Sequence, residues 1–177
     1  QLKTAQRILQ KVPDAGFAVA AFKPSHAIRV RQLLAELALP AEVHVGKTGE
    51  LIAAADCALA VSGSVSLELL YHTTPTVIVY RISRLAYFVQ ACFRRVRYIT
   101  LVNLLTDPQL FAGDVGVYEA NNPRDAHVLM PEYLTCEDRT EVMAAHIVRW
   151  LNDPSKYKRL VEQMAALKSQ VAQGGAS

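Results

Sequence analysis

The sequence has few of the residues that cross-link small proteins or anchor chains in membranes. Its three cysteines, Cys57, Cys92 and Cys136, are odd in number and widely spaced, which excludes a complete disulfide framework and a Cys-x-x-Cys zinc site. A reducing cytoplasm is therefore the expected compartment. No stretch approaches the roughly 18 consecutive apolar residues of a membrane span, so we predict no transmembrane helix.

Strong charge and several catalytic signatures are also missing. The chain carries 19 Lys and Arg against 16 Asp and Glu, without the dense basic blocks of nucleic-acid-binding proteins, so we expect no nucleic acid partner. The histidines lack metal-ligand spacing with each other and with carboxylates, so we expect no metal, and no cofactor is expected either. Walker, Gly-x-Gly-x-x-Gly and Gly-x-Ser-x-Gly patterns do not occur.

The 177 residues, enough for one domain, contain an alternation of apolar segments. Helical spacing is already present at Leu2 without an initiator Met, which we interpret as a sign that the chain is a piece of a longer protein. Apolar runs predict strands, the first of them buried on both faces, at 16–22, 42–45, 57–61 and 76–80. Helical patterns fall between them, at 26–37, 50–55 and 67–72. This alternation predicts an α/β fold with a parallel sheet flanked by helices.

The final third changes character. A helix is predicted at 83–95 and a turn-rich insertion at about 106–130, both within a domain that spans 1–134. Two closing helices are expected within 135–172, and residues 173–177 are expected to fray.

Capping residues predict where the closing helices begin. Thr135 is placed to cap a helix that starts near Glu137, and Asp153 to cap one that starts at Pro154.

The residues that follow the predicted strand at 57–61 form the first candidate site, because ligands bind outside the carboxyl ends of parallel strands. Gly63 removes side-chain bulk there, and nearby hydroxyls can donate to a phosphate, with an acidic side chain placed to accept from sugar hydroxyls. These polar residues are Ser62, Ser64, Ser66 and Glu68. The alternative is structural: Ser64 caps the next helix and Glu68 complements its dipole.

The tight turn after the strand at 42–45 is a second candidate. It reads Gly46, Lys47, Thr48, Gly49, Glu50. Its two glycines can let the backbone approach a planar base, whereas Thr48 and Glu50 can instead cap the following helix.

Two single residues complete the candidates. Arg81, at the end of the strand at 76–80, can bind a pyrophosphate through two parallel hydrogen bonds or pair with a surface carboxylate. Asn103 lies in an apolar setting and is either a ligand contact or a structural amide with satisfied partners.

The segment from Arg81 to Arg97 interleaves aromatic and aliphatic residues with arginines. Such a helix can lie on an anionic membrane, with its aromatic residues in the interface. A core helix with a cationic carboxyl-terminal end has the same pattern.

Several ordered segments resemble the carboxyl-terminal half of the lipid-A-disaccharide synthase family. The opening Leu2 to Gln6 and the residues after Pro131 also fit, so the resemblance covers nearly the whole chain. The segments that carry it are Ala55-Asp56-Cys57-Ala58-Leu59-Ala60-Val61-Ser62-Gly63-Ser64-Val65-Ser66-Leu67-Glu68, Pro75-Thr76-Val77-Ile78-Val79-Tyr80-Arg81 and Tyr98-Ile99-Thr100-Leu101-Val102-Asn103-Leu104-Leu105.

The resemblance implies the Rossmann-like, donor-binding half of a GT-B type glycosyltransferase. That family transfers a glucosamine-derived unit from UDP-2,3-diacylglucosamine to lipid X and releases UDP. By the resemblance, Ser62, Gly63, Ser64 and Ser66 would contact the donor phosphates, Glu68 a sugar or ribose, and residues 46–50 the uracil. Asn103 would have a functional, catalytic role. A cytoplasmic location, with peripheral contact with the inner membrane, would follow.

Departures from the family pattern bear on these expectations. Val102 stands where the family usually has Pro, and the region around 113–129 resembles an insertion. The expected general base and the acceptor domain would lie before Gln1, so we expect the chain alone to bind the donor weakly and to be inactive. The absent first strand also predicts an exposed sheet edge and a homodimer. A non-catalytic nucleotide-binding module and a relative of the UDP-sugar epimerases are the alternative functions.

Overall fold

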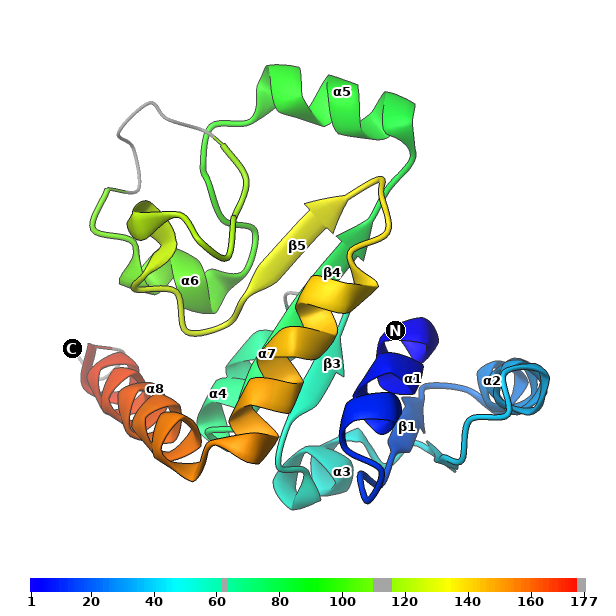
Figure 1. The fold of residues 1–177 in the computed structure, drawn as a ribbon. Coiled ribbons are helices and arrows are strands. Elements are labelled where there is room, and N and C mark those ends of the chain that lie inside the picture. The colour runs from blue at the N-terminus through cyan, green and yellow to red at the C-terminus, as the bar shows by residue number, and fades with distance from the viewer. Residues whose placement is uncertain (62–63, 110–115, 175–177) are drawn as a thin grey trace.

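In the computed structural model, which describes residues 1–61, 64–109 and 116–174, parallel strands are flanked by helices (Figure 1). The helices are α1 (Leu2–Lys11), α2 (Pro24–Glu36), α3 (Thr48–Ala54), α4 (Val65–Tyr71), α5 (Arg84–Phe93), α6 (Leu101–Thr106), α7 (Thr140–Asn152) and α8 (Pro154–Gly174). The strands are β1 (Ala18–Ala21), β2 (Glu42–Val45), β3 (Ala58–Ala60), β4 (Thr76–Arg81) and β5 (Glu132–Thr135). A 3₁₀ turn, η1, spans Pro123–Asp125. The predicted α/β class is confirmed.

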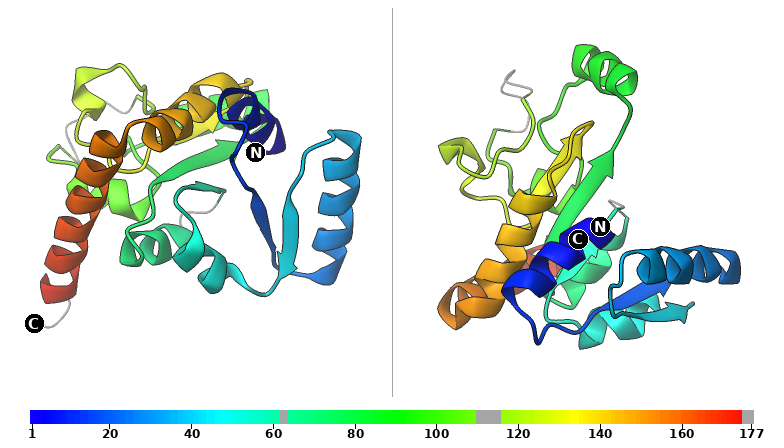
Figure 2. Two further views of the ribbon diagram at one scale, coloured as in Figure 1. Left: turned by 60° about the horizontal axis from the view of Figure 1, so that its bottom comes forward. Right: turned by 45° about the vertical axis from the view of Figure 1, so that its right-hand side comes forward.

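The strands form two parallel sheets. β1 pairs with β2, with Ala18 opposite Glu42. The second sheet has the order β3-β4-β5, with Ala58 opposite Thr76 and Ile78 opposite Glu132. The β1–β2 sheet and α2 lie at one end of the molecule and α8 at the other (Figure 2).

β4 organises the core because alternate residues of a strand face opposite sides of a sheet. Val77 and Val79 pack in the cluster that contains Ile147 and Trp150 of α7. Ile78 packs in the cluster that contains Leu69 of α4. The central strand is thus covered on both faces, and the loops that follow β3, β4 and β5 all lie at one edge of this sheet.

The predicted burial of the first strand was wrong. Ala18 and Ala20 are exposed in β1, Val19 is half-buried, and only Ala21 is buried. An apolar run rich in alanine does not show whether a strand is buried on one face or on both. Leaving an alanine side chain in water costs little free energy, because its apolar area is small.

β5 was not predicted. It follows a turn-rich segment, and its residues Glu132–Thr135 neither alternate nor run apolar, so they give no periodic signal. Pairing with β4 makes these residues a strand. β3 pairs only with β4 among the described strands, and a homodimer through its open edge stays a prediction.

One predicted cap was wrong and one was confirmed. α7 begins at Thr140, and the Thr135 hydroxyl accepts instead from the N–H of Glu137, at 2.9 Å, in the turn after β5. Asp153 Oδ1 accepts from the N–H of Lys156, at 3.1 Å, as a cap for α8 does. α8 continues to Gly174, so the first two residues of the expected frayed tail are helical and the rest lie outside the described residues.

Candidate functional site

The first predicted loop is only partly described, because Ser62 and Gly63 lie outside the described residues. Ser64 is exposed and stands just before α4 in helical conformation, and among the described residues its side chain makes no capping hydrogen bond. Ser66 is fully buried inside α4, whereas Glu68 in the first turn is exposed. Of the described members, Ser64 and Glu68 are therefore the ones that solvent or a ligand can reach.

The second predicted loop forms the start of α3. Gly46 has φ 68°, a left-handed conformation that glycine adopts without strain, and Lys47 after it is exposed. α3 begins at Thr48, earlier than predicted, so Gly49 and Glu50 lie in its first turn. Lys47 occupies the position before the helix without a side-chain cap among the described residues, so capping by Thr48 is not observed.

The structure brings these two loops together. A Cβ placed on Gly49 would lie 3.2 Å from Glu68 Oε1, closer than an ordinary van der Waals contact. The absence of a side chain at Gly49 therefore leaves the space that the Glu68 carboxylate occupies. One acidic side chain thus lies against the backbone of α3, next to the glycine turn that precedes this helix.

Arg81 ends β4 and is exposed at the carboxyl edge of the sheet. Because β3 and β4 run parallel, Arg81 lies on the same edge of the sheet as the loop after β3.

Asn103 lies away from this edge and is fully buried in α6. Its Nδ2 donates to the backbone oxygen of Met130, at 2.7 Å, and to Glu132 Oε2, at 3.0 Å. Its Oδ1 accepts from the Met130 N–H, at 3.2 Å. Glu132 also accepts from the N–H groups of Ile99 and Thr100, at 2.6 and 2.9 Å. This geometry supports the structural amide, and the catalytic role stays an untested prediction.

Arg97 and Asp125 form a buried ion pair that sequence reasoning missed. Arg97 Nε and Nη2 each donate to one Asp125 oxygen, both at 2.7 Å, and Tyr98 Oη donates to Oδ1 at 2.6 Å. Burial opposes ionisation of Asp125, yet hydrogen bonds from Arg97, Tyr98 and the Glu119 N–H hold its pKa below the ordinary value. Arg97 is therefore not part of a membrane-facing basic surface.

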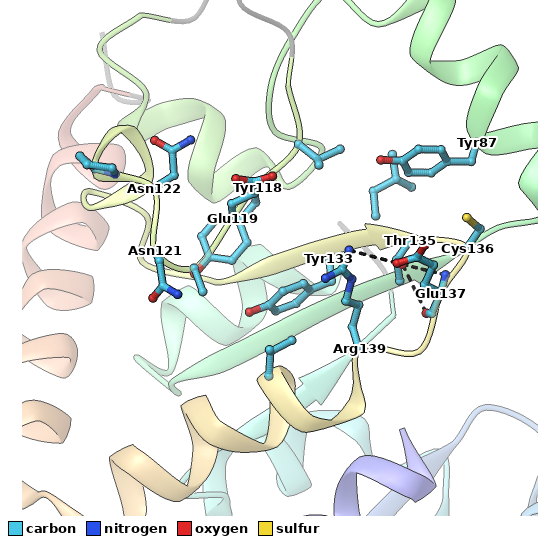
Figure 3. Close-up of a pocket in the computed structure, with 15 residues that line it drawn as sticks. Tyr87, Tyr118, Glu119, Asn121, Asn122, Tyr133, Thr135, Cys136, Glu137 and Arg139 are labelled. Atoms are coloured by element: carbon cyan, nitrogen blue, oxygen red, sulfur yellow. Dashed lines mark hydrogen bonds and ion pairs between the residues drawn. The ribbon is translucent and has the colours of Figure 1, made fainter.

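A cavity of about 650 Å³ lies at the carboxyl end of β5 and contains none of the predicted site residues (Figure 3). Tyr87 of α5, Tyr118, Tyr133 of β5 and Arg139 before α7 line it. Sequence reasoning missed this place because β5 was not predicted. Tyr133 and Leu134, shortly after Pro131, were the available signal.

The described residues, 1–61, 64–109 and 116–174, contain no cluster of three or more His, Cys, Asp or Glu side chains arranged to hold a metal. In the same part of the chain, every helix is too short or too polar to cross a bilayer.

Known sequences match this chain over most of its length. The family model described as lipid-A-disaccharide synthetase matches residues 1–160. The chain is 31% identical to a lipid-A-disaccharide synthase of Pseudomonas syringae pv. syringae over 115 residues, which cover 63% of this chain and 30% of that protein. It is 25% identical to one of Geobacter sulfurreducens over 176 residues, which cover 99% of this chain and 41% of that protein.

The chain therefore spans less than half of the length of these relatives. The family model covers more than half of this chain, and the parallel α/β architecture agrees with the expected Rossmann-like half of a GT-B enzyme. The chain belongs to the lipid-A-disaccharide synthetase family.

Proposed function

We propose that this chain is the donor-binding part of a glycosyltransferase of lipid A biosynthesis. The donor would be UDP-2,3-diacylglucosamine and the acceptor lipid X, joined into a disaccharide 1-phosphate with release of UDP. The observation that carries the proposal is the contact between Gly49 and Glu68, which joins the start of α3, after β2, to α4, after β3. Family membership supports the same activity.

The exposed groups around this contact and at the end of β4 divide between the parts of a nucleotide sugar. Glu68 accepts from the hydroxyls of the ribose or the sugar, and the Ser64 hydroxyl donates to a phosphate. Lys47 and Arg81 contribute positive charge, which stabilises the departing pyrophosphate most when its negative charge develops in the transition state. The uracil packs on the backbone of the turn from Gly46 to Glu50.

Catalysis on this proposal needs more than this chain. The segment matched in the relatives covers 30% to 41% of their length, and the general base is expected outside this segment. The chain alone would bind the donor weakly and form no disaccharide. Disaccharide formation by the purified chain would contradict this part of the proposal.

Replacing Glu68 by alanine is expected to weaken UDP binding at least tenfold, because a hydrogen bond to a charged group contributes about 1.5–3 kcal/mol. Titration calorimetry with UDP measures the effect, and Glu36→Ala, which removes an exposed carboxylate from α2, is the matched control. Gly49→Ala should also weaken UDP binding, because the added methyl group displaces the Glu68 carboxylate.

The result with AMP separates the functions. Binding of UDP but not of AMP supports the transferase. Equal binding of UDP and AMP would favour a general nucleotide-binding module. Absence of UDP binding by a folded sample would contradict the proposed donor site.

We also propose that α5 binds peripherally to an anionic membrane surface. α5, all of whose residues are described, buries none of them and stands beyond the ends of β4 and β5 (Figure 1). This exposure supports membrane contact rather than the core-helix interpretation. The side chains of Leu85, Phe88 and Phe93 are 74%, 68% and 78% exposed. Arg84 and Arg95 are exposed on the same segment.

Removing the aromatic groups of α5 is expected to abolish most of this contact. The double variant Phe88→Ser, Phe93→Ser should bind phosphatidylglycerol vesicles at least tenfold more weakly in a sedimentation assay, because each phenyl ring contributes about 1.5–3 kcal/mol when buried. Phe22→Ser is the control, since Phe22 is 78% exposed at the far end of the molecule. Equal losses in both variants would contradict a specific role of α5.

A further inference from the structure

The cavity at the carboxyl end of β5 has aromatic walls and more acidic than basic side chains (Figure 3). Its volume of about 650 Å³ lies in the range of small-molecule sites, which is about 300–1,000 Å³. Among the described residues that line it, the acidic ones are Glu119, on the segment before η1, and Glu137, after β5. The basic one is Arg139. This lining favours a positively charged ligand over an anion.

The two carboxylates of the cavity differ in their charge balance. Arg139 Nη2 lies 3.3 Å from Glu137 Oε2, so these two charges compensate each other. Glu119 is exposed, and its carboxylate has no ion-pair partner within residues 1–61, 64–109 and 116–174. The backbone N–H of Glu119 donates to Asp125 Oδ2, at 2.9 Å, which holds the residue in place while its carboxylate stays accessible. Glu119 is therefore the uncompensated charge of the cavity.

Two buried tyrosines form a neutral wall. Tyr118 and Tyr133 meet edge to face, with ring centroids 5.3 Å apart. The Tyr133 hydroxyl lies 2.8 Å from His146 Nε2, and burial raises the pKa of Tyr133 to about 12. Burial also lowers the pKa of His146 to about 4. At neutral pH this imidazole is therefore uncharged, and it does not repel a cation from behind the tyrosines.

Tyr87 of α5 supplies a more accessible ring, because it is half-buried whereas Tyr118 and Tyr133 are buried. Arg94 Cζ lies 6.0 Å from the centroid of the Tyr87 ring, which is about the outer limit of a cation–π contact. The negative face of an aromatic ring attracts an organic cation for the same reason. A cation in the cavity would therefore meet both an aromatic ring and a carboxylate.

We propose that this cavity binds a small organic amine in its protonated form. The ammonium group lies against the Glu119 carboxylate, and the apolar part of the amine packs against the tyrosine rings. An amine fits better than a metal ion, because the described part of the chain has no cluster of three or more His, Cys, Asp or Glu side chains that could hold one. The lining contains none of the residues assigned to the nucleotide sugar, so the amine is an additional ligand whose binding does not depend on the proposed function.

Three probes of similar shape separate the effect of charge from that of the ring. At neutral pH benzylamine is a cation, benzyl alcohol is uncharged and benzoate is an anion. Titration calorimetry of the whole chain in low-salt buffer should show benzylamine binding roughly fivefold tighter than benzyl alcohol, because only the ammonium group gains an ion pair and a cation–π contact. Equal affinities of the three probes, or tightest binding of benzoate, would overturn the proposal.

Glu119→Gln removes the uncompensated charge and keeps the shape of the side chain. It should weaken benzylamine binding roughly threefold and leave benzyl alcohol binding unchanged, because an exposed ion pair contributes modestly. Glu36→Gln, which removes an exposed carboxylate from α2, is the matched control and should change neither. Circular dichroism verifies that each variant is folded. Equal effects of the two substitutions would contradict the role of Glu119.

Arg139→Gln should act in the opposite direction. It removes a positive charge from the lining and leaves Glu137 without its partner, so benzylamine binding should become roughly twofold tighter. Arg149→Gln, which neutralises an exposed arginine of α7 outside the cavity, should leave the affinity unchanged. Weaker benzylamine binding by Arg139→Gln would show that the cavity selects anions and would overturn the proposal.

The aromatic part of the site is tested at Tyr87. Tyr87→Leu should weaken benzylamine binding roughly threefold, whereas Tyr87→Phe should retain it, because the ring face and not the hydroxyl attracts the cation. Equal losses in both variants would contradict the role of the ring. A chain that binds benzylamine but not UDP would support this site and contradict the donor assignment.

Discussion

Asp125→Ala is expected to lower the free energy of unfolding by about 3–5 kcal/mol, the cost of leaving one member of a buried ion pair without its partner. The side chains of Arg97 and Asp125 are 4% and 1% exposed, so water cannot replace the lost carboxylate. The variant also leaves the Tyr98 hydroxyl and the Glu119 N–H without their acceptor.

Urea denaturation of the wild-type chain and the variant measures this loss. Glu162→Gln is the matched control, because it breaks the Lys158–Glu162 pair, which is 3.9 Å long and whose side chains are 79% and 65% exposed, and it should leave the midpoint almost unchanged. Similar losses in both variants would contradict the special role of the buried pair.

The same pair predicts a pH dependence with a definite sign. The pKa of Asp125 is lowered in the folded state, so its contribution is complete above the ordinary carboxyl value near 4 and is lost as the pH falls through the folded value. The stability difference between wild type and Asp125→Ala should therefore shrink in denaturation series carried below about pH 4.

Asn103→Ala is expected to lower the free energy of unfolding by about 3 kcal/mol, because unsatisfied buried polar groups cost about 1–3 kcal/mol each. The substitution leaves both backbone groups of Met130 and one oxygen of Glu132 without this partner. Asn103→Asp should lower the free energy of unfolding further, since it places a second carboxylate about 3 Å from that of Glu132.

Two measurements distinguish the structural from the catalytic role of Asn103. One is urea denaturation of the variant, and the other is a UDP titration of the folded variant. A structural amide predicts lost stability with UDP affinity retained by the folded fraction. Asn152→Ala, at the exposed end of α7, is the control for removal of an amide. Unchanged stability of Asn103→Ala would contradict the structural role.

The local sequence pattern predicted most elements, because the spacing of apolar residues within a segment indicates both its secondary structure and the face that it buries. Residues 42–45 and 76–80 alternate or run apolar in the manner of strands, and both are strands in the structure. Residues 132–135 are as long as 42–45 but neither alternate nor run apolar, and only the neighbouring β4 makes them a strand. The exposed alanines of β1 show the opposite error, in which an apolar run is taken for a buried one.

The candidate site, too, was predictable from the sequence only in part. The composition of two loops predicted ligand-binding residues at Gly46 to Glu50 and around Ser64 and Glu68. Nothing in either loop predicted that Gly49 and Glu68 touch, because that contact depends on how α3 and α4 pack. Arg97 and Arg139 look alike in the sequence, yet one is buried against Asp125 and the other is exposed beside a cavity.

The sequence by itself thus determined the class of the fold, the order of most elements and the loops that carry polar groups at strand ends. These are properties of residues close together in the chain, where period, capping and backbone preference act. Only the tertiary structure decided which loops meet, which charges are buried and where a cavity opens. Those outcomes depend on contacts between residues far apart in the chain, and the pattern of a single segment does not encode its partner.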